Sequence, residues 1–160
     1  MTTKPVAIVS GGCGFIGSHL VDLLISKGFI VRVIDNLIGG REENLIQHSK
    51  EKNLQICIKD IRNFNENDSI FKDVDHFYHF AGIGDIVPSI ENPLEYMSVN
   101  VQGTINMLEC SRVNNVKKFI YSASSSCYGL AKTPTKENHK INTTYPYALS
   151  KYQGEQAAFH

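Results

Sequence analysis

Five short runs rich in β-branched and aromatic residues alternate along the chain with longer segments of helical spacing. These runs cover residues 5–10, 29–35, 54–60, 76–82 and 117–124. Strands that alternate with helices in this way predict a parallel sheet covered by helices on both faces. We therefore expect a Rossmann-like, doubly wound α/β domain over residues 1–160, with binding sites outside the carboxyl ends of its strands.

Three segments between or after these runs have features of helices. After the first run, helical spacing predicts a buried stripe made of Ile16, Leu20, Leu23 and Leu24, with Gly28 ending the helix. Asn92 and Pro93 have the form of a helix start, and we expect that helix to reach residue 113. Its predicted apolar stripe comprises Leu94, Met97, Val101, Ile105 and Leu108. A last helix is expected to begin near Tyr147.

Composition and charge argue against several classes of partner. The chain has 16 basic and 16 acidic residues and a net charge of zero, so we expect no broad attraction to nucleic acid or to a membrane surface. No apolar run approaches the length of a membrane span, and the start does not read as a secretory leader. The four cysteines are scattered without a CxxC pair, which favours a reduced, cytoplasmic setting and argues against a metal site.

The sequence SGGCGFIG follows the first predicted strand and opens the first predicted helix. Gly11, Gly14 and Gly17 form a GxxGxxG pattern. A tight strand-to-helix turn needs residues without Cβ, and a pyrophosphate must approach the amides at the helix start. A glycine-rich turn without function is the alternative, but the position between strand and helix favours dinucleotide binding.

Acidic residues end the second and third predicted strands. Asp35 lies 18 residues after Gly17, where a carboxylate can accept hydrogen bonds from both ribose hydroxyls and would repel a 2′-phosphate. This predicts NAD rather than NADP, and Arg41 lies too far along the loop to reverse the preference. Asp60 could meet the adenine amino group or serve equally as a surface turn residue.

The fourth and fifth predicted strands end in contrasting sequences. The fourth ends in HFAG, whose small residues would let a dinucleotide lie flat, and His79 is expected to be packed rather than to act as an acid or base. The fifth ends in SASSSCYG. Buried hydroxyls need partners, so this run predicts either a polar ligand nearby or a turn capped by its own side chains.

Two tyrosine–lysine pairs have the four-residue spacing that can bring side chains together on a helix. Tyr128 and Lys132 lie in a segment that Gly129 and a TPT sequence mark as a loop, whereas Tyr147 and Lys151 lie on a predicted helix. A free phenol has a pKa of about 10, and a nearby ammonium favours its ionised form. Tyr147 and Lys151 therefore form the candidate pair for proton exchange with a hydroxyl.

Taken together, these residues resemble the extended short-chain dehydrogenase/reductase family, and most of all its nucleotide-sugar epimerases of the UDP-glucose or UDP-N-acetylglucosamine 4-epimerase kind. The resemblance rests, in the family's order, on GGCGFIGSHL, DNLIGGREENL, KDIR, HFAG, NPLEYMSVNVQGTINMLE, SASSSCYG and YPYALSK. It implies NAD as the cofactor and a UDP-linked nucleotide sugar as the substrate.

The resemblance also implies roles for individual residues. Catalysis would fall to Ser124, Tyr147 and Lys151, with Ser124, Ser125 and Tyr147 contacting the substrate. Cofactor binding would involve Gly11, Gly14, Phe15, Ile16, Gly17, Asp35, Asn36, Asp60, Ile61, Phe80, Ala81, Gly82, Asn100, Tyr147 and Lys151. The reaction would be transient oxidation at C4 by NAD, rotation of the 4-keto sugar and return of hydride.

Departures from related enzymes leave alternatives open. Ser125 and Ser126 stand where related dehydratases carry Asp-Glu, and decarboxylases usually have Glu at the position of Ser126, which favours an epimerase. Gly84 stands where some hexose epimerases have a lysine. A dehydratase, decarboxylase or reductase of the same family, or an NAD-binding module without catalysis, remain the alternatives.

The resemblance further implies a longer protein. Members of the family run to roughly twice this length, because a C-terminal region supplies most contacts to the sugar and nucleotide. We therefore expect the 160 residues to be the N-terminal part of such an enzyme, without efficient turnover on their own. The family often forms homodimers through the helix over 93–113 and the helix near Tyr147, and we expect truncation of the second helix to weaken such a contact.

Overall fold

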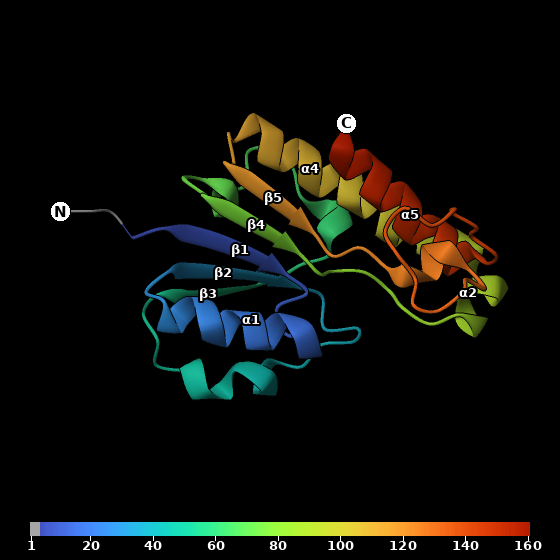
Figure 1. Cartoon of the computed structure of the whole chain (residues 1–160). Helices are drawn as coiled ribbons and strands as arrows, with labels where there is room; N and C mark the ends of the chain where they lie inside the picture. Colours follow the sequence, from blue (N-terminus) through green and yellow to red (C-terminus); the bar gives the residue numbers. More distant parts are fainter. Residues whose placement is uncertain (1–3) are drawn as a thin grey trace.

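A five-stranded sheet forms the centre of the molecule in the computed structural model, which describes residues 4–160 (Figure 1). The strands are β1 (Val6–Ser10), β2 (Ile30–Asp35), β3 (Leu54–Ile58), β4 (His76–His79) and β5 (Lys118–Tyr121). Their order is β3-β2-β1-β4-β5, and every neighbouring pair is parallel. The Rossmann-like fold is thus confirmed, although the last two strands end three residues earlier than predicted.

Side chains alternate between the two faces of the sheet because successive residues of a strand point to opposite sides. In β1, Ala7 and Val9 join the core beneath one helical layer, whereas Ile8 joins the core on the other face. All five residues of β1 are buried. A strand that is buried on both faces needs an unbroken apolar run, as the sequence VAIVS provides.

Helices cover both faces of the sheet. On one face lie α1 (Phe15–Ser26) and the 3-10 segment η1 (Glu42–His48), and on the other lie α4 (Thr104–Val113) and α5 (Pro146–Phe159) (Figure 1). The short helix α2 (Val87–Glu91) was not predicted. The remaining 3-10 segments are η2 (Ile61–Asn63), η3 (Ser69–Phe71) and η5 (Ser125–Tyr128).

The helix predicted over 93–113 exists but is not uniform. It consists of α3 (Pro93–Met97), a π-helical segment η4 (Ser98–Gly103) and α4. Asn92 occupies the cap position as predicted, but its side chain makes no capping hydrogen bond. Such π-helical insertions often occur at functional sites, because they displace residues from the regular helical positions.

The apolar stripe predicted for this helix was only partly right, because Met97, Val101 and Leu108 are half-buried rather than buried. Leu94 is 82% exposed and Ile105 is 50% exposed. The buried face instead carries Tyr96, Val99, Asn100, Gly103, Thr104, Met107 and Cys110. This face is mixed in polarity because Asn100 and Thr104 have side-chain partners on other elements. The helix also approaches η2 so closely that a Cβ on Gly103 would lie 2.5 Å from the end of Ile61.

The stripe predicted for the first helix was also only partly right. Ile16 and Leu23 are exposed, whereas Leu24 is buried together with Gly17, Ser18 and Val21. Helix α1 turns its glycine-containing face inward because its first turn packs against the backbone at Gly11. Gly28 follows the helix in the left-handed region, with φ 82°, and its N–H donates to the Ile25 carbonyl, as the sequence predicted. No helix within residues 4–160 is both long and apolar enough to span a membrane.

Candidate functional site

Two neighbouring cavities lie at the carboxyl ends of the strands. The first, of about 570 Å³, extends from the glycine turn past the ends of β2 and β3 to α3. The second, of about 430 Å³, extends from the same turn to the end of β5 and to α5. Both are lined by Gly11, Gly14, Phe80, Gly82, Ile83 and Gly84. They therefore meet where the chain leaves β1 and β4, which is the point where the strand order reverses.

The glycine turn has the geometry that close backbone packing demands. Gly11 has φ 73°, and a Cβ there would lie 2.8 Å from the Ala81 nitrogen. A Cβ on Gly17 would collide with the Gly11 carbonyl oxygen. Only glycine fits these two positions, so the turn brings backbone rather than side chains to the cavity wall.

The start of α1 offers amides to an anion. Gly14 occupies the cap position without a side-chain cap, and the first turn contains no acidic residue. The first amides of a helix have no partner within the helix, and the helix dipole favours negative charge there. The predicted residues Phe15 and Ile16 line the second cavity at this point. The turn therefore fits a pyrophosphate group.

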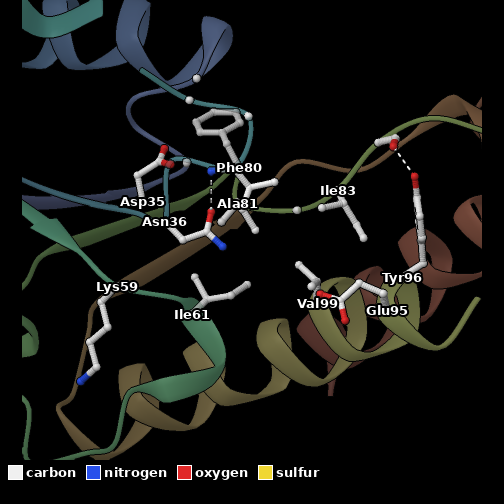
Figure 2. A pocket seen from close by; sticks show the side chains of 17 residues that line it. Asp35, Asn36, Lys59, Ile61, Phe80, Ala81, Ile83, Glu95, Tyr96 and Val99 are labelled. Atoms are coloured by element: carbon white, nitrogen blue, oxygen red, sulfur yellow. Dashed lines mark hydrogen bonds between the residues drawn. The ribbon is translucent and has the colours of Figure 1, made fainter. Parts of the chain in front are cut away.

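Asp35 ends β2 as predicted and is only 7% exposed. Its two carboxylate oxygens accept 2.9 Å hydrogen bonds from the amides of Cys13 and Leu37. A Cβ on Gly40 would lie 2.9 Å from both of these oxygens, so the following loop folds closely over the carboxylate. Asp35 and Asn36 line the first cavity on the side opposite Tyr96 (Figure 2).

The negative charge of Asp35 affects its neighbour. Burial, together with the charges of Asp35 and Glu42, raises the pKa of the Cys13 thiol to about 12. Cys13 is therefore a neutral, buried packing residue of the glycine turn. An ionised carboxylate has room for further hydrogen bonds beyond the two that Asp35 already accepts, so it can also bind hydroxyl groups of a ligand.

Asp60 mainly serves the local structure. Its carboxylate accepts hydrogen bonds from the backbone and guanidinium of Arg62 and a longer one, of 3.3 Å, from Asn36. The Arg62 partner lowers the pKa of Asp60. Ile61 and Lys59, on either side, line the first cavity. The turn role considered from the sequence is thus present, and contact with adenine stays a prediction.

The side chain of Asn100 fixes the loop after β4 by hydrogen bonds to the backbone of Ile83. The Asn100 side-chain carbonyl accepts a 2.8 Å hydrogen bond from the Ile83 amide, and its NH₂ group donates to the Ile83 carbonyl at 2.9 Å. The same NH₂ group donates to the Ser150 hydroxyl at 3.0 Å. Asn100 is buried beneath the loop, whereas Phe80, Ala81 and Gly82 line the cavity as predicted. The structure therefore places Asn100 as a support for the loop.

The pair Tyr147 and Lys151 lies on α5, and both side chains line the second cavity together with the glycine turn. The Lys151 nitrogen lies over the ring of Tyr121. Burial lowers the pKa of Lys151 to about 8, against the opposing effect of Glu155. The rival tyrosine, Tyr128, ends η5, and Lys132 lies in the irregular segment beyond it. The prediction that Tyr147 and Lys151 share a helix is therefore confirmed.

The serine run after β5 satisfies many of its own hydrogen bonds. Ser124 caps η5 by accepting a bond from the Ser126 amide, and the two hydroxyls lie 2.6 Å apart. Ser122 and Ala123, rather than Ser124 and Ser125, line the second cavity. The self-capped turn considered from the sequence is thus present, and the catalytic role of Ser124 stays a prediction.

Sequence reasoning missed Tyr96. Its hydroxyl donates a 2.5 Å hydrogen bond to the Gly84 carbonyl, as Figure 2 shows. Its ring packs edge-to-face against Tyr147 with the centroids 6.2 Å apart. Burial and the neighbouring Asp85 and Tyr147 raise the pKa of Tyr96. Its helical spacing to Val99 and Gly103 could have indicated that Tyr96 lies on the buried face of the helix. No local pattern in the sequence indicates that its hydroxyl bonds the loop at Gly84.

The fold and the groove formed by the two cavities are those of a Rossmann-like protein with a site across its strand ends. Comparison with known proteins narrows this class. The chain belongs to the NAD dependent epimerase/dehydratase family, whose model matches residues 7–160. This membership confirms the resemblance found in the sequence and the expectation of NAD as the cofactor of the family.

Individual relatives agree with this membership. The chain is 40% identical to a putative UDP-glucose 4-epimerase from Methanocaldococcus jannaschii, over 93% of this chain and 48% of that protein. A UDP-N-acetylglucosamine 4-epimerase from Methanobrevibacter ruminantium, solved with UDP-N-acetylmuramic acid, shares 35% identity with a TM-score of 0.89, over 97% of this chain and 49% of that one.

A solved structure with a different activity is also similar. The dTDP-glucose 4,6-dehydratase DesIV from Streptomyces venezuelae, solved with NAD, has a TM-score of 0.87 and 28% identity, over 95% of this chain and 50% of that one. The shared fold therefore does not separate epimerases from dehydratases. The chain spans about half the length of the relatives that it matches.

Proposed function

We propose that the chain binds NAD across its two cavities and carries the proton-transfer residues of a nucleotide-sugar 4-epimerase. The observation that carries this proposal is that Tyr147 and Lys151 line the same cavity as the glycine turn. A cofactor whose pyrophosphate lies at that turn would place one end beside Asp35 and the other beside Tyr147. The family membership and the epimerase relatives support the same assignment.

At the adenosine end, the proposed contacts follow from the first cavity. Asp35 would accept the ribose hydroxyls, with Asn36 beside it, and its charge would disfavour a 2′-phosphate. The segments around Asp60 and Ile61 would flank the adenine. Because Asp35 is already fixed by two backbone amides, little conformational freedom is lost when a ribose binds to it.

At the reactive end, the protein residues handle the proton. NAD, when bound, supplies the hydride acceptor and donor for the sugar carbon. Tyr147 would take the proton from the 4-hydroxyl of the sugar, and the Ser124 hydroxyl would hold the same oxygen. Lys151, on the same helix and in the wall of the same cavity, would bind the nicotinamide ribose. Return of the proton from Tyr147 would complete the turnover.

Ser125 and Ser126 support an epimerase over a dehydratase. Eliminating water from a sugar needs an acid and a base beside the reacting carbons. In this chain the turn after β5 offers hydroxyl groups at these positions, and the Ser126 hydroxyl already pairs with Ser124. UDP is the proposed nucleotide because the epimerase relatives named above act on or bind UDP-linked sugars.

A homodimer in the cytoplasm is part of the proposal. The outward stripe of the α3–α4 helix contains the exposed side chains of Leu94 and Ile105, which a second copy would cover together with α5. The four cysteines are all free, which fits a reducing compartment.

The test measures cofactor binding and epimerisation separately. The 160-residue chain is titrated with NAD by calorimetry. A chimera that continues residues 1–160 with the remaining length of the Methanocaldococcus jannaschii relative is incubated with NAD and a panel of UDP-sugars, and C4 epimers are scored. We expect NAD binding by the chain, and epimer formation by a chimera that binds NAD.

Tyr147→Phe is the decisive variant. We expect it to keep NAD binding and to lower epimerisation at least 100-fold, as loss of general acid–base catalysis does. Tyr152→Phe, on the same helix without a proposed role, is the matched control and should behave as the unchanged protein. Full epimerisation by Tyr147→Phe would refute the proposed role of Tyr147 in proton transfer. Release of CO₂ or net formation of NADH by the unchanged chimera would refute the epimerase assignment.

A further inference from the structure

A chain of buried hydrogen bonds crosses the molecule beneath the two cavities. Its central member is His79, which is 1% exposed yet uses both ring nitrogens. Nδ1 lies 2.7 Å from the Ser10 hydroxyl, and Nε2 lies 2.9 Å from the Thr104 hydroxyl. Ser10 and His79 are register partners at the ends of β1 and β4, whereas Thr104 begins α4. One imidazole thus joins two strands to the helical layer.

The direction of each bond in this chain is determined. The Thr104 hydroxyl donates its single proton to the Asn100 carbonyl at 2.7 Å, so it must accept from His79 Nε2. Nε2 therefore carries the ring proton, and Nδ1 accepts from Ser10. The Ser10 hydroxyl in turn accepts a longer bond, of 3.4 Å, from the Ala81 amide. Donors and acceptors run in one direction from Ala81 to Asn100.

The imidazole is held neutral and in one orientation. Burial, together with the nearby Lys151 ammonium, lowers the pKa of His79 to about 3. The rings of Phe119 and Tyr121 pack against it at centroid distances of 5.6 and 5.8 Å. A neutral ring with fixed neighbours has a single tautomer that satisfies both hydroxyls, so the chain of bonds has one arrangement.

Asn100, where this chain of bonds ends, connects the cavity loop to α5. Its side chain holds both the amide and the carbonyl of Ile83 and donates to the Ser150 hydroxyl. Ser150 donates a 2.8 Å hydrogen bond to the Tyr147 carbonyl. Asn100 lies within the π-helical segment η4, where the regular helical positions are displaced, so its orientation needs support from outside the helix.

Helix α5 packs directly against the backbone carbonyl of Asn100, which is the group that accepts the Thr104 hydrogen bond. A Cβ on Gly154 would lie 3.0 Å from the Asn100 carbonyl oxygen and 2.5 Å from the Tyr121 hydroxyl. The carbonyl that accepts the Thr104 bond therefore also forms part of the surface on which α5 rests. A change in its direction would move the loop and the helix together.

We propose that His79 and Thr104 are positioning residues, which fix Asn100 and thereby set the loop at Ile83 and the helix of Tyr147 relative to the glycine turn. Neither residue lines the first or the second cavity, so they act through Asn100 rather than on a ligand in these cavities. The positioning of Asn100, the loop at Ile83 and α5 is inferred from the hydrogen bonds alone. The expected effect on NAD binding rests on the proposed function.

The first test concerns the unchanged protein. The ring ¹⁵N shifts of His79, measured by NMR, should show the neutral tautomer with the proton on Nε2 from pH 6 to pH 8. The opposite tautomer in this range would overturn the proposal, because Nε2 would then accept the Thr104 proton that the Asn100 carbonyl needs. A charged ring would overturn it as well, because Nδ1 could not then accept from the Ser10 hydroxyl.

The second test uses Thr104→Val, which keeps the shape of the side chain but removes the hydroxyl. The substitution leaves the buried Nε2–H of His79 without a partner and removes the bond from Thr104 to Asn100. We therefore expect the hydrogen-exchange protection of the Ile83 amide, which donates to Asn100, to fall about tenfold relative to the core amide of Val33. Thr104→Ser should restore it. Ser111→Ala is the matched control, because the Ser111 hydroxyl is buried on the same helix and has no hydrogen-bond partner within residues 4–160.

The third test is the NAD affinity of the same variants of the chain. We expect binding to weaken about tenfold in Thr104→Val and to be unchanged in Thr104→Ser and Ser111→Ala. If the unchanged chain does not bind NAD, the proposed function fails, and the Ile83 amide still decides the positioning role. Three results would each overturn the proposal. The first is unchanged protection of the Ile83 amide in Thr104→Val, and the second is a loss of protection in Thr104→Ser equal to that in Thr104→Val. The third is lost protection in Thr104→Val with full NAD affinity.

Discussion

The Lys151 ammonium lies 4.3 Å from the centre of the Tyr121 ring, and the Tyr121 hydroxyl donates a 3.0 Å hydrogen bond to the Lys151 carbonyl. One aromatic residue thus contacts both the side chain and the backbone of the lysine. The contact keeps the cation in the wall of the second cavity instead of in bulk water. The lowered pKa of Lys151, about 8, is the electrostatic cost of that position.

This cost should appear in the pH dependence of stability. In the unfolded chain Lys151 has its ordinary pKa of 10.5, so between pH 8 and pH 10.5 the unfolded state binds more protons at this residue than the folded state. Its contribution to the free energy of unfolding therefore rises with pH across this window, by at most about 3 kcal/mol. Below pH 8 the cost of the buried charge is fully present.

The measurement compares the unchanged chain with Lys151→Met by urea unfolding from pH 7 to pH 10.5. The two proteins are compared because the buried thiols of Cys13 and Cys110 have raised pKa values of about 12 and 11 and therefore lower the stability of both proteins above pH 9. Taking the difference between their free energies of unfolding removes this shared effect. We expect the difference in free energy to change in favour of the unchanged chain as the pH rises. The exposed Lys27→Met variant should show no such trend.

Gly17→Ala should damage the glycine turn. The added Cβ collides with the Gly11 carbonyl oxygen, which belongs to the backbone and cannot move aside as the end of a flexible side chain could. We expect a loss of roughly 1–3 kcal/mol in the free energy of unfolding, together with loss of NAD binding. Gly39→Ala, where an added Cβ meets nothing within 4 Å, should leave stability within about 0.5 kcal/mol. Equal stability of the two variants would contradict the turn geometry.

Asp35→Asn should change cofactor preference. The substitution removes the charge that disfavours a 2′-phosphate, and it leaves one of the two backbone amides facing an NH₂ group, which cannot accept a hydrogen bond. We expect the ratio of NADP to NAD affinity, measured by calorimetry, to rise about tenfold. Asp73→Asn, at an exposed left-handed position that asparagine also accepts, serves as control. An unchanged ratio would remove Asp35 from the adenosine site.

Tyr96→Phe should loosen the loop after β4. It deletes the hydroxyl that donates to the Gly84 carbonyl but keeps the ring that packs on Tyr147. Because water can reach the exposed Gly84, we expect a loss of only about 1 kcal/mol in urea unfolding. Tyr128→Phe, which loses a longer 3.3 Å bond to the Glu137 carbonyl in an exposed loop, should cost less. The reverse order would show that Tyr96 does not hold the loop.

Local sequence was sufficient where a residue's role depends on its own backbone. The glycine turn could be predicted because tight strand-to-helix turns exclude side chains, and Gly11 and Gly17 do sit where a Cβ has no space. Asp35 could be predicted because it ends a strand at a fixed distance from that turn. The pairing of Tyr147 with Lys151 needed only helical spacing.

Tertiary contacts decided what the sequence could not. Apolar spacing suggested that Leu94 and Ile105 face the core, but the helix turns Tyr96, Asn100 and Thr104 inward instead, because these side chains have partners on other elements. The bond between Ser10 and His79 joins residues 69 positions apart, and the bond between Asn100 and Ser150 joins residues 50 apart. No local pattern carries such pairings.

The loop from Phe80 to Gly84 supplies a wall common to both cavities. For protein engineering, this divides the site into regions that can and cannot be altered independently. Substitutions of Ile38 and Gly39 change the lining of the first cavity alone, whereas Gly40 has to stay glycine because a Cβ there would lie 2.9 Å from the Asp35 carboxylate. Any substitution in the shared wall changes the lining of both cavities at once, including the surroundings of Tyr147. Libraries for altered specificity should therefore vary Ile38 and Gly39 and leave the loop from Phe80 to Gly84 constant.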